Sequence, residues 1–166
     1  MDVLFSPRRY SYVTSAKEEG DGCVLCRIRE AKDDASSLVL HRATANFVLI
    51  NRYPYNNGHL MIVPNRHESD FHRLQPEERA EMAELAALAE RILREAYKAH
   101  GINMGMNLGE AAGAGILGHL HLHLLPRWKG DTNFMTVVGA TRVVPEEPDG
   151  TFARLRPLFE QAAGAR

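Results

Sequence analysis

Several features that would narrow the class of this protein are scarce or missing. The chain has only two cysteines among 166 residues, which argues against a scaffold held together by disulfides. Its formal net charge is −1, which argues against a broad nucleic-acid-binding surface but allows a local pocket for a small nucleotide. No apolar run reaches the roughly 18 residues of a membrane-spanning helix, and the N-terminus has no signal-peptide pattern. We therefore expect a cytoplasmic protein without membrane contacts.

The composition is that of one globular domain. Hydrophobic residues make up 45% and charged residues 25% of the chain, and neither an internal repeat nor a low-complexity tract divides it. We expect a single domain over residues 1–166, with an irregular N-terminal arm (1–22) and a C-terminal part (129–166) made of an extended segment and a helix. Runs rich in valine, leucine, isoleucine and phenylalanine predict strands at 38–41, 46–51, 59–63, 102–108 and 117–125.

Residues 76–99 show the clearest helical pattern. Pro76 suits a first turn, two glutamates follow it, and Gly101 comes just after the end. The apolar positions recur at spacings of three and four: Met82, Leu85, Leu88, Ala89, Ile92, Leu93 and Ala96. A shorter helix is predicted from Cys26 to about Lys32. The expected class is α+β, an antiparallel sheet of about five strands with one long helix packed on it and a C-terminal helix.

The segment His119-Leu120-His121-Leu122-His123-Leu124 carries the strongest functional signal. Side chains alternate between the two faces of a strand, so the histidines are predicted to share one face and the leucines the other. Such a row offers bases and nucleophiles that work near neutral pH. The preceding glycine-rich loop (109–115) has backbone N–H groups that could meet a phosphate, so chemistry on a phosphate is the leading hypothesis.

The spacing of the row limits what it can bind. Same-face neighbours on a strand are about 7 Å apart and the outer pair about 14 Å apart. The outer histidines therefore cannot share one metal ion held at about 2.1 Å. We expect adjacent members to pair and the row to serve two tasks, with a metal at one end and a phosphate at the other.

The cysteine pair Cys23-Val24-Leu25-Cys26 leaves three interpretations open. A Cys-x-x-Cys motif is consistent with zinc, with thioredoxin-like redox chemistry, or with chance. The redox interpretation needs a buried strand before the motif, and the Gly20-Asp21-Gly22 approach does not supply one. Zinc needs two further ligands, for which the chain has histidines available.

Taken together, three segments resemble the histidine triad (HIT) superfamily: residues 57–64 (Asn-Gly-His-Leu-Met-Ile-Val-Pro), Asn107 with the glycine-rich loop, and residues 119–126. The resemblance runs from about Cys23 to Trp128. Within the superfamily, Pro-Arg-Trp at 126–128 and Gly-Asp-Thr-Asn-Phe at 130–134 look most like the bacterial diadenosine-polyphosphate phosphorylase and hydrolase branch.

The resemblance implies a role for each member of the site. His121 would be the nucleophile that attacks the α-phosphorus of a nucleoside polyphosphate and forms a nucleotidyl-histidine intermediate. His123 and His59 would contact phosphate oxygens or the leaving group. The remaining substrate contacts would come from Asn51 to the ribose hydroxyls, and from Asn107 and the backbone N–H groups near Gly113 and Gly115 to the non-bridging oxygens.

The resemblance also implies a metal site and a dimer. HIT proteins with the cysteine pair bind a structural zinc ion, and here the four ligands would be Cys23, Cys26, His67 and His119. Family members are usually homodimers that form through the long helix and an added strand. The expected partners of the chain are therefore a nucleotide substrate, orthophosphate and a second copy of itself, with no nucleic acid and no membrane.

One departure from the family pattern bears on the reaction. Many family hydrolases carry a glutamine in the loop before the triad, whereas this loop reads Gly113-Ala114-Gly115. A small, amide-lined pocket could seat orthophosphate in place of water, which favours phosphorolysis of diadenosine tetraphosphate to ADP and ATP. The triad has no obvious carboxylic acid nearby, so a phosphate leaving group is favoured over an amine. The alternatives are hydrolysis of a diadenosine polyphosphate or a nucleoside phosphoramidate, and a non-catalytic nucleotide-binding module.

Overall fold

A computed structural model describes residues 22–131 and 146–164 of the chain. The predicted N-terminal arm, apart from Gly22, and most of the predicted extended segment after residue 129 lie outside the described residues. None of the helices in the described ranges combines the length and the apolar character that a bilayer crossing requires.

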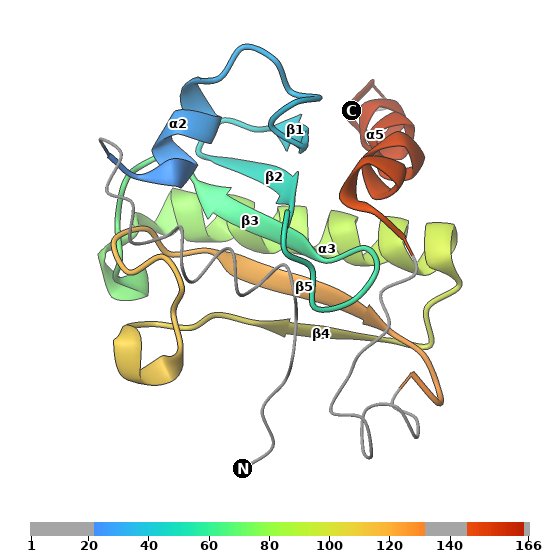
Figure 1. Cartoon of the computed structure of the whole chain (residues 1–166). Helices are drawn as coiled ribbons and strands as arrows, with labels where there is room; N and C mark the ends of the chain where they lie inside the picture. Colours follow the sequence, from blue (N-terminus) through green and yellow to red (C-terminus); the bar gives the residue numbers. More distant parts are fainter. Residues whose placement is uncertain (1–21, 132–145, 165–166) are drawn as a thin grey trace.

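The predicted antiparallel sheet of five strands is confirmed (Figure 1). Its strands are β1 (Val39–Arg42), β2 (Asn46–Ile50), β3 (Leu60–Pro64), β4 (Gly101–Gly105) and β5 (Leu122–Arg127). They lie in the order β1-β2-β3-β5-β4, and every neighbouring pair is antiparallel. This order places β5, which carries the end of the histidine row, between β3 and the edge strand β4.

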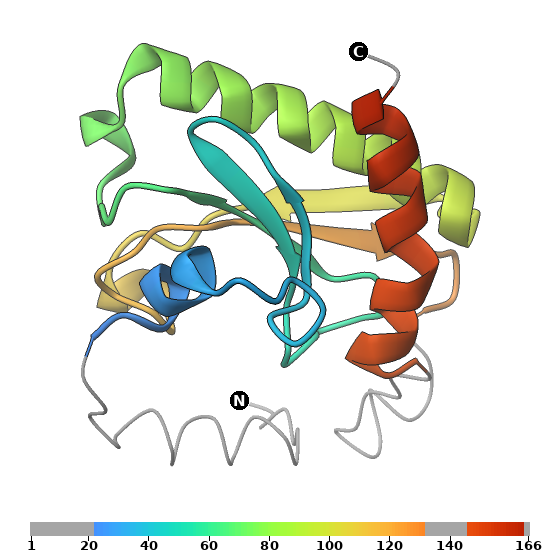
Figure 2. The ribbon, with the colours of Figure 1, turned by 90° about the horizontal axis from the view of Figure 1, so that it is seen from above.

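Helices cover both faces of the sheet. The long helix α3 (Pro76–Tyr97) lies along one face and the short helix α2 (Val24–Glu30) lies on the other, while the C-terminal helix α5 (Pro148–Gly164) crosses one end of α3 (Figure 2). Two short 3-10 turns, η1 (Phe71–Arg73) and η2 (Glu110–Ala112), complete the described elements. Helix α3 begins with a capping box, in which the side chains of Gln75 and Glu78 each accept a backbone N–H of the other residue.

The alternation of side chains along the strands produces two cores. The larger core lies between the sheet and α3 and α5, and it contains Val48, Ile50, Leu60, Ile62, Leu120, Leu122 and Leu124 with the predicted apolar face of α3. The smaller core lies under α2 and contains Leu25, Val39, Phe47, Leu49, Met61 and Val63. His123 pairs with Met61 across the ladder and therefore shares the α2 face, opposite the leucines.

The predicted limits of the last two strands are wrong. Strand β5 runs over Leu122–Arg127 instead of 117–125, so His119 and His121 precede it. The backbone of this approach is bonded elsewhere, because the Leu120 N–H donates to the Glu68 carbonyl at 2.8 Å. Strand β4 ends at Gly105, opposite His123, instead of reaching Leu108. Strand β4 is an edge strand that pairs only with β5 in this sheet. Its ladder therefore ends near the first residues of β5.

Candidate functional site

The structure divides the row of three histidines between two clusters. His119 lies with Cys23, Cys26 and His67, which we call the cysteine–histidine cluster. His121 and His123 lie with His59, which we call the three-histidine cluster. The division agrees with the spacing argument, in which adjacent histidines pair and the outer two serve different tasks.

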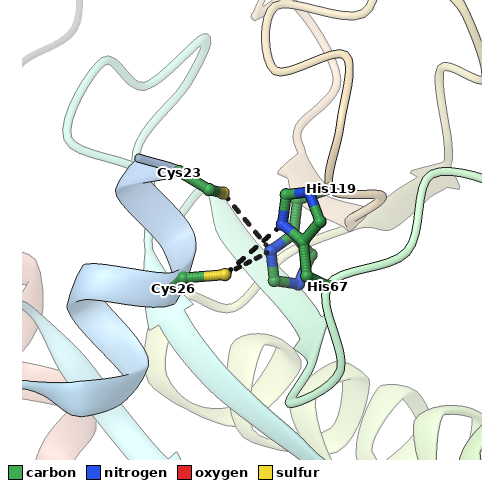
Figure 3. A group of neighbouring side chains, drawn as sticks. All are labelled: Cys23, Cys26, His67 and His119. Carbon is green, nitrogen blue, oxygen red and sulfur yellow. Dashed lines mark hydrogen bonds between the residues drawn. The ribbon is translucent and has the colours of Figure 1, made fainter. Parts of the chain in front are cut away.

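The cysteine–histidine cluster brings together segments that are far apart in the sequence. Cys23 and Cys26 lie at the start of α2, His67 follows β3, and His119 precedes β5, and the four side chains point toward one another (Figure 3). The Cys23 Sγ and Cys26 Sγ atoms lie 3.4 and 3.6 Å from Nδ1 of His119. Cys26 Sγ also lies 3.4 Å from Nδ1 of His67, and all four ligand atoms are within 4.8 Å of one another.

These distances fit a tetrahedral metal ion. With metal–sulfur and metal–nitrogen bonds of about 2.3 and 2.1 Å, a sulfur and a nitrogen ligand of one zinc ion lie about 3.6 Å apart. The second ring nitrogen of His119, Nε2, lies 2.9 Å from the Pro64 carbonyl oxygen, so it carries the proton and leaves the Nδ1 lone pair to face the sulfurs. Burial and the neighbouring Cys23 raise the pKa of the Cys26 thiol, so a bound cation would have to displace that proton.

In the three-histidine cluster, one ring nitrogen of His121 has no hydrogen-bond partner among the described residues. Its Nδ1 lies 3.0 Å from the backbone carbonyl oxygen of His119, which can only accept, so Nδ1 carries the proton. Nε2 of the neutral ring therefore holds a lone pair. Burial lowers the pKa of His121, so the imidazole is neutral near pH 7, the form that acts as a nucleophile.

His59 and His123 form a directional pair. The Tyr55 backbone N–H donates to Nδ1 of His59 at 3.1 Å, and Nε2 of His59 lies 2.8 Å from Nδ1 of His123. Because a backbone N–H can only donate, Nε2 of neutral His59 carries the proton and donates it to Nδ1 of His123. His123 then carries its own proton on Nε2 and presents an N–H donor.

The environment keeps this pair uncharged. Burial, and then repulsion from His123 and His121, hold the pKa of His59 well below its usual range. Burial and the neighbouring His121 lower the pKa of His123 to about 4. Both rings are therefore neutral near pH 7, and the cluster offers oriented N–H groups instead of net positive charge.

Of the remaining predicted contact residues, Asn51 lies beside His59 and Asn107 lines a cavity together with His123. Nδ2 of Asn51 lies 3.4 Å from Nδ1 of His59, and its Oδ1 accepts the Tyr53 N–H at 2.9 Å. Asn107 donates to the Gly113 carbonyl at 3.4 Å, and Gly115 follows in the same loop. Gly113 adopts a left-handed conformation with φ of 85° after η2, a geometry that suits glycine.

A cavity of about 240 Å³ adjoins His123. The Tyr55 side chain, two methionines of β4 and the segment after it, and Asn107 contribute to its lining. The ring of Tyr55 lies 4.8 Å from the ring of His59 and 6.0 Å from that of His123, between centroids. Tyr55 is not among the site residues predicted from the sequence, and its position four residues before His59 was the available signal.

Comparisons with known proteins agree with this arrangement. A family model described as "HIT domain" matches residues 32–130. The chain is 36% identical over 150 residues, 86% of this chain and 76% of the relative, to a Mycobacterium tuberculosis protein named AP-4-A phosphorylase. It is 26% identical over 101 residues, 61% of this chain and 55% of the relative, to the asymmetrical bis(5'-nucleosyl)-tetraphosphatase of Schizosaccharomyces pombe.

Solved structures show the same fold. A Zn-bound histidine triad family protein from Mycobacterium smegmatis superimposes with a TM-score of 0.70 at 28% identity, covering 87% of this chain and 98% of the other. These likenesses confirm the predicted fold class and the family resemblance.

Proposed function

This chain belongs to the HIT family, and we propose on that premise that it transfers a nucleotidyl group from a diadenosine polyphosphate through a covalent nucleotidyl-histidine intermediate. Orthophosphate is the favoured acceptor, which would make the activity a phosphorolysis of diadenosine tetraphosphate to ADP and ATP. The 36% identity to a protein named AP-4-A phosphorylase supports this choice of substrate and acceptor.

One observation carries the proposal, namely the hydrogen bond from Nδ1 of His121 to the His119 carbonyl oxygen. It leaves the Nε2 lone pair of His121 as the nucleophile in a neutral ring. In the first step Nε2 bonds to the α-phosphorus and the bond from that phosphorus to the bridging oxygen breaks, so that ATP leaves. In the second step an oxygen of orthophosphate attacks the same phosphorus, the phosphorus–nitrogen bond breaks, and ADP is released.

The neighbouring residues have roles that match the charge of the reaction. The Nε2–H of His123 would donate to a phosphate oxygen as negative charge develops, and His59 would hold His123 in that tautomer. Asn107 and the amides near Gly113 and Gly115 would bind non-bridging oxygens, and Asn51 the ribose. The departing polyphosphate has a pKa near 6, so it leaves without a carboxylic acid to protonate it.

We further propose that Cys23, Cys26, His67 and His119 hold a structural zinc ion. The support is the four-ligand geometry, the proton of His119 on the nitrogen away from the sulfurs, and the likeness to a Zn-bound HIT protein. When bound, zinc would tie α2 to the segments that precede β5 and follow β3. A homodimer is also proposed, and light scattering of the purified protein would test it.

Product analysis tests the proposed reaction. The protein is incubated with diadenosine tetraphosphate with and without orthophosphate, and the products are separated by ion-exchange chromatography. ADP and ATP formed only with orthophosphate would support the phosphorylase. AMP and ATP formed regardless of orthophosphate would identify an asymmetric hydrolase, as the relationship to the S. pombe tetraphosphatase would suggest. Nucleotide binding without any product would indicate that the protein is a nucleotide-binding module without catalytic activity.

A further inference from the structure

Two hydrogen bonds hold the loop between β2 and β3 (Tyr53–Gly58). Toward the three-histidine cluster, the Tyr55 backbone N–H donates to Nδ1 of His59 at 3.1 Å. Toward β5, the Asn56 side chain donates through Nδ2 to the Pro126 carbonyl oxygen at 3.2 Å. The two contacts come from consecutive residues, so the Asn56 contact restrains the backbone next to the Tyr55 N–H.

Asn56 occupies a buried and polar niche. Only 9% of it is exposed, and its Nδ2 also lies 3.5 Å from Oδ2 of Asp131. Asp131 is itself held by Arg127, with an Nη2–Oδ1 distance of 2.7 Å. The Oδ1 atom of Asn56 accepts the N–H of Asn57 at 3.1 Å. Both ends of the Asn56 amide therefore have partners, and the two described partners of the amino group are oxygen acceptors.

We propose that Asn56 is a positioning residue that fixes the tautomer of the His59–His123 pair. It holds the loop so that the Tyr55 N–H meets Nδ1 of His59, which leaves the His59 proton on Nε2 and the His123 proton on its own Nε2. Its effect on turnover rests on the proposed function, because the Nε2–H of His123 is the group that would meet the phosphate.

The opposite tautomer would invert the polarity of the site. If the Tyr55 N–H moved away, the proton of His59 could reside on Nδ1, and Nε2 would then accept from His123. His123 would present a lone pair to phosphate oxygens in place of a donor. Asn51 Nδ2 lies 3.4 Å from the same His59 nitrogen, a longer contact than that of Tyr55, so the Tyr55 N–H is the stronger constraint.

The test compares Asn56→Asp with Asn57→Asp. The first change replaces the amino group of Asn56 by a carboxylate oxygen that faces the Pro126 carbonyl and Asp131, so the contact becomes repulsive. The second adds the same charge one residue away but keeps an acceptor, because Asn57 uses its Oδ1 to accept the N–H of Glu146 at 3.3 Å. Asn56→Ala serves as a second variant, which removes the donor without adding charge.

Two readouts are needed, the histidine ring ¹⁵N chemical shifts by NMR and the steady-state constants. In the wild type and in Asn57→Asp, His59 and His123 should both show protonated Nε2 and unprotonated Nδ1. In Asn56→Asp and Asn56→Ala the shifts of both rings should move toward a mixture of tautomers, and kcat should fall roughly 10- to 100-fold with little change in KM.

Either of two results would overturn the inference: unchanged ring shifts in both Asn56 variants, whatever their activity, or the same altered shifts in Asn57→Asp. Circular dichroism establishes that the compared variants are folded. If the wild type turns over no dinucleoside polyphosphate, the proposed function fails, while the ring shifts still decide the role of Asn56.

Discussion

The backbone carbonyl oxygen of His119 accepts the Nδ1–H of His121 at 3.0 Å. The imidazole of the same His119 contributes to the cysteine–histidine cluster, and its Nε2–H is bonded to the Pro64 carbonyl at 2.9 Å. One residue thus belongs to the candidate metal site through its side chain and orients the candidate nucleophile through its backbone. The two clusters have different chemistry, but His119 connects them structurally.

Replacing the nucleophile should abolish turnover without unfolding the protein. We expect His121→Ala to lower kcat by roughly a thousandfold or more, because no other group replaces the attacking Nε2. His72→Ala is the matched control, since His72 is exposed in η1. Turnover of diadenosine tetraphosphate and circular dichroism are measured for both variants. Near-normal activity in folded His121→Ala would contradict the assignment of the nucleophile.

Removing a metal ligand should remove the metal and lower stability. His67→Ala is expected to lose the zinc that the wild type retains through dialysis, as measured by atomic absorption. Its free energy of unfolding should fall by about 3 kcal/mol or more, since a ligand present at a hundred times its Kd stabilises the folded state by about that amount. The His72→Ala control should keep one zinc per chain. A wild-type protein purified without chelator and free of zinc would refute the site.

Stability should depend on pH through the buried histidines. The pKa of His123 is lowered from 6.5 to about 4 by burial and by His121, and that of His59 is also lowered. Between these pH values the unfolded chain binds more protons than the folded one. The free energy of unfolding therefore rises with pH in this window, and the stability that these histidines contribute is lost on acidification. The contribution of His123 is on the order of 3 kcal/mol.

Denaturant unfolding of the wild type and His123→Asn between about pH 4.5 and 6.5 tests this dependence. The variant should show a shallower slope. Carboxylates such as Glu78, whose pKa is lowered from 4.5 by its hydrogen bond with Arg66, act mainly below this range. Equal slopes in the two proteins would show that His123 does not titrate differently in the folded and unfolded states.

Gly58 should tolerate no side chain. Its φ of +68° is unfavourable for other residues, and an added Cβ would lie 2.9 Å from the Tyr97 ring and 3.1 Å from Pro126. We expect Gly58→Ala to lower the free energy of unfolding by about 2–4 kcal/mol. Gly101→Ala is the control, because a Cβ there meets no atom within 4 Å. Thermal or denaturant unfolding compares the two, and equal stabilities would contradict the packing argument.

The sequence was sufficient to predict the architecture because hydrophobic periodicity reports burial directly. The alternation of Leu120, Leu122 and Leu124 placed the leucines on the core face, and the three-to-four spacing after Pro76 located the apolar face of α3 correctly. The spacing of the row also predicted that His119 and His123 serve different tasks, and the family resemblance assigned the metal to His119. These conclusions depend on local patterns, which the fold preserves.

The strand limits and the loop contacts could not be predicted in the same way. Strand β5 begins later than predicted because the Leu120 N–H bonds to the Glu68 carbonyl, a partner that is remote in sequence. Strand β5 also continues through Pro126, which lies beyond the end of its pairing with β3 and opposite Ile102 of β4. The environment of Asn56 depends on Pro126 and Asp131, which no local pattern connects to it.

The short strand β3 joins the two clusters at its ends. His59 precedes its first residue and bonds to His123, while Pro64 is its last residue and accepts from His119. The length that β3 spans must therefore suit the length of chain from His119 to His123. Evolution can exchange one apolar side chain for another along this strand, but a single insertion or deletion would break one of the two bonds and turn the following side chains to the wrong face. We expect natural variation here to be confined to substitutions, with the length of the strand kept constant.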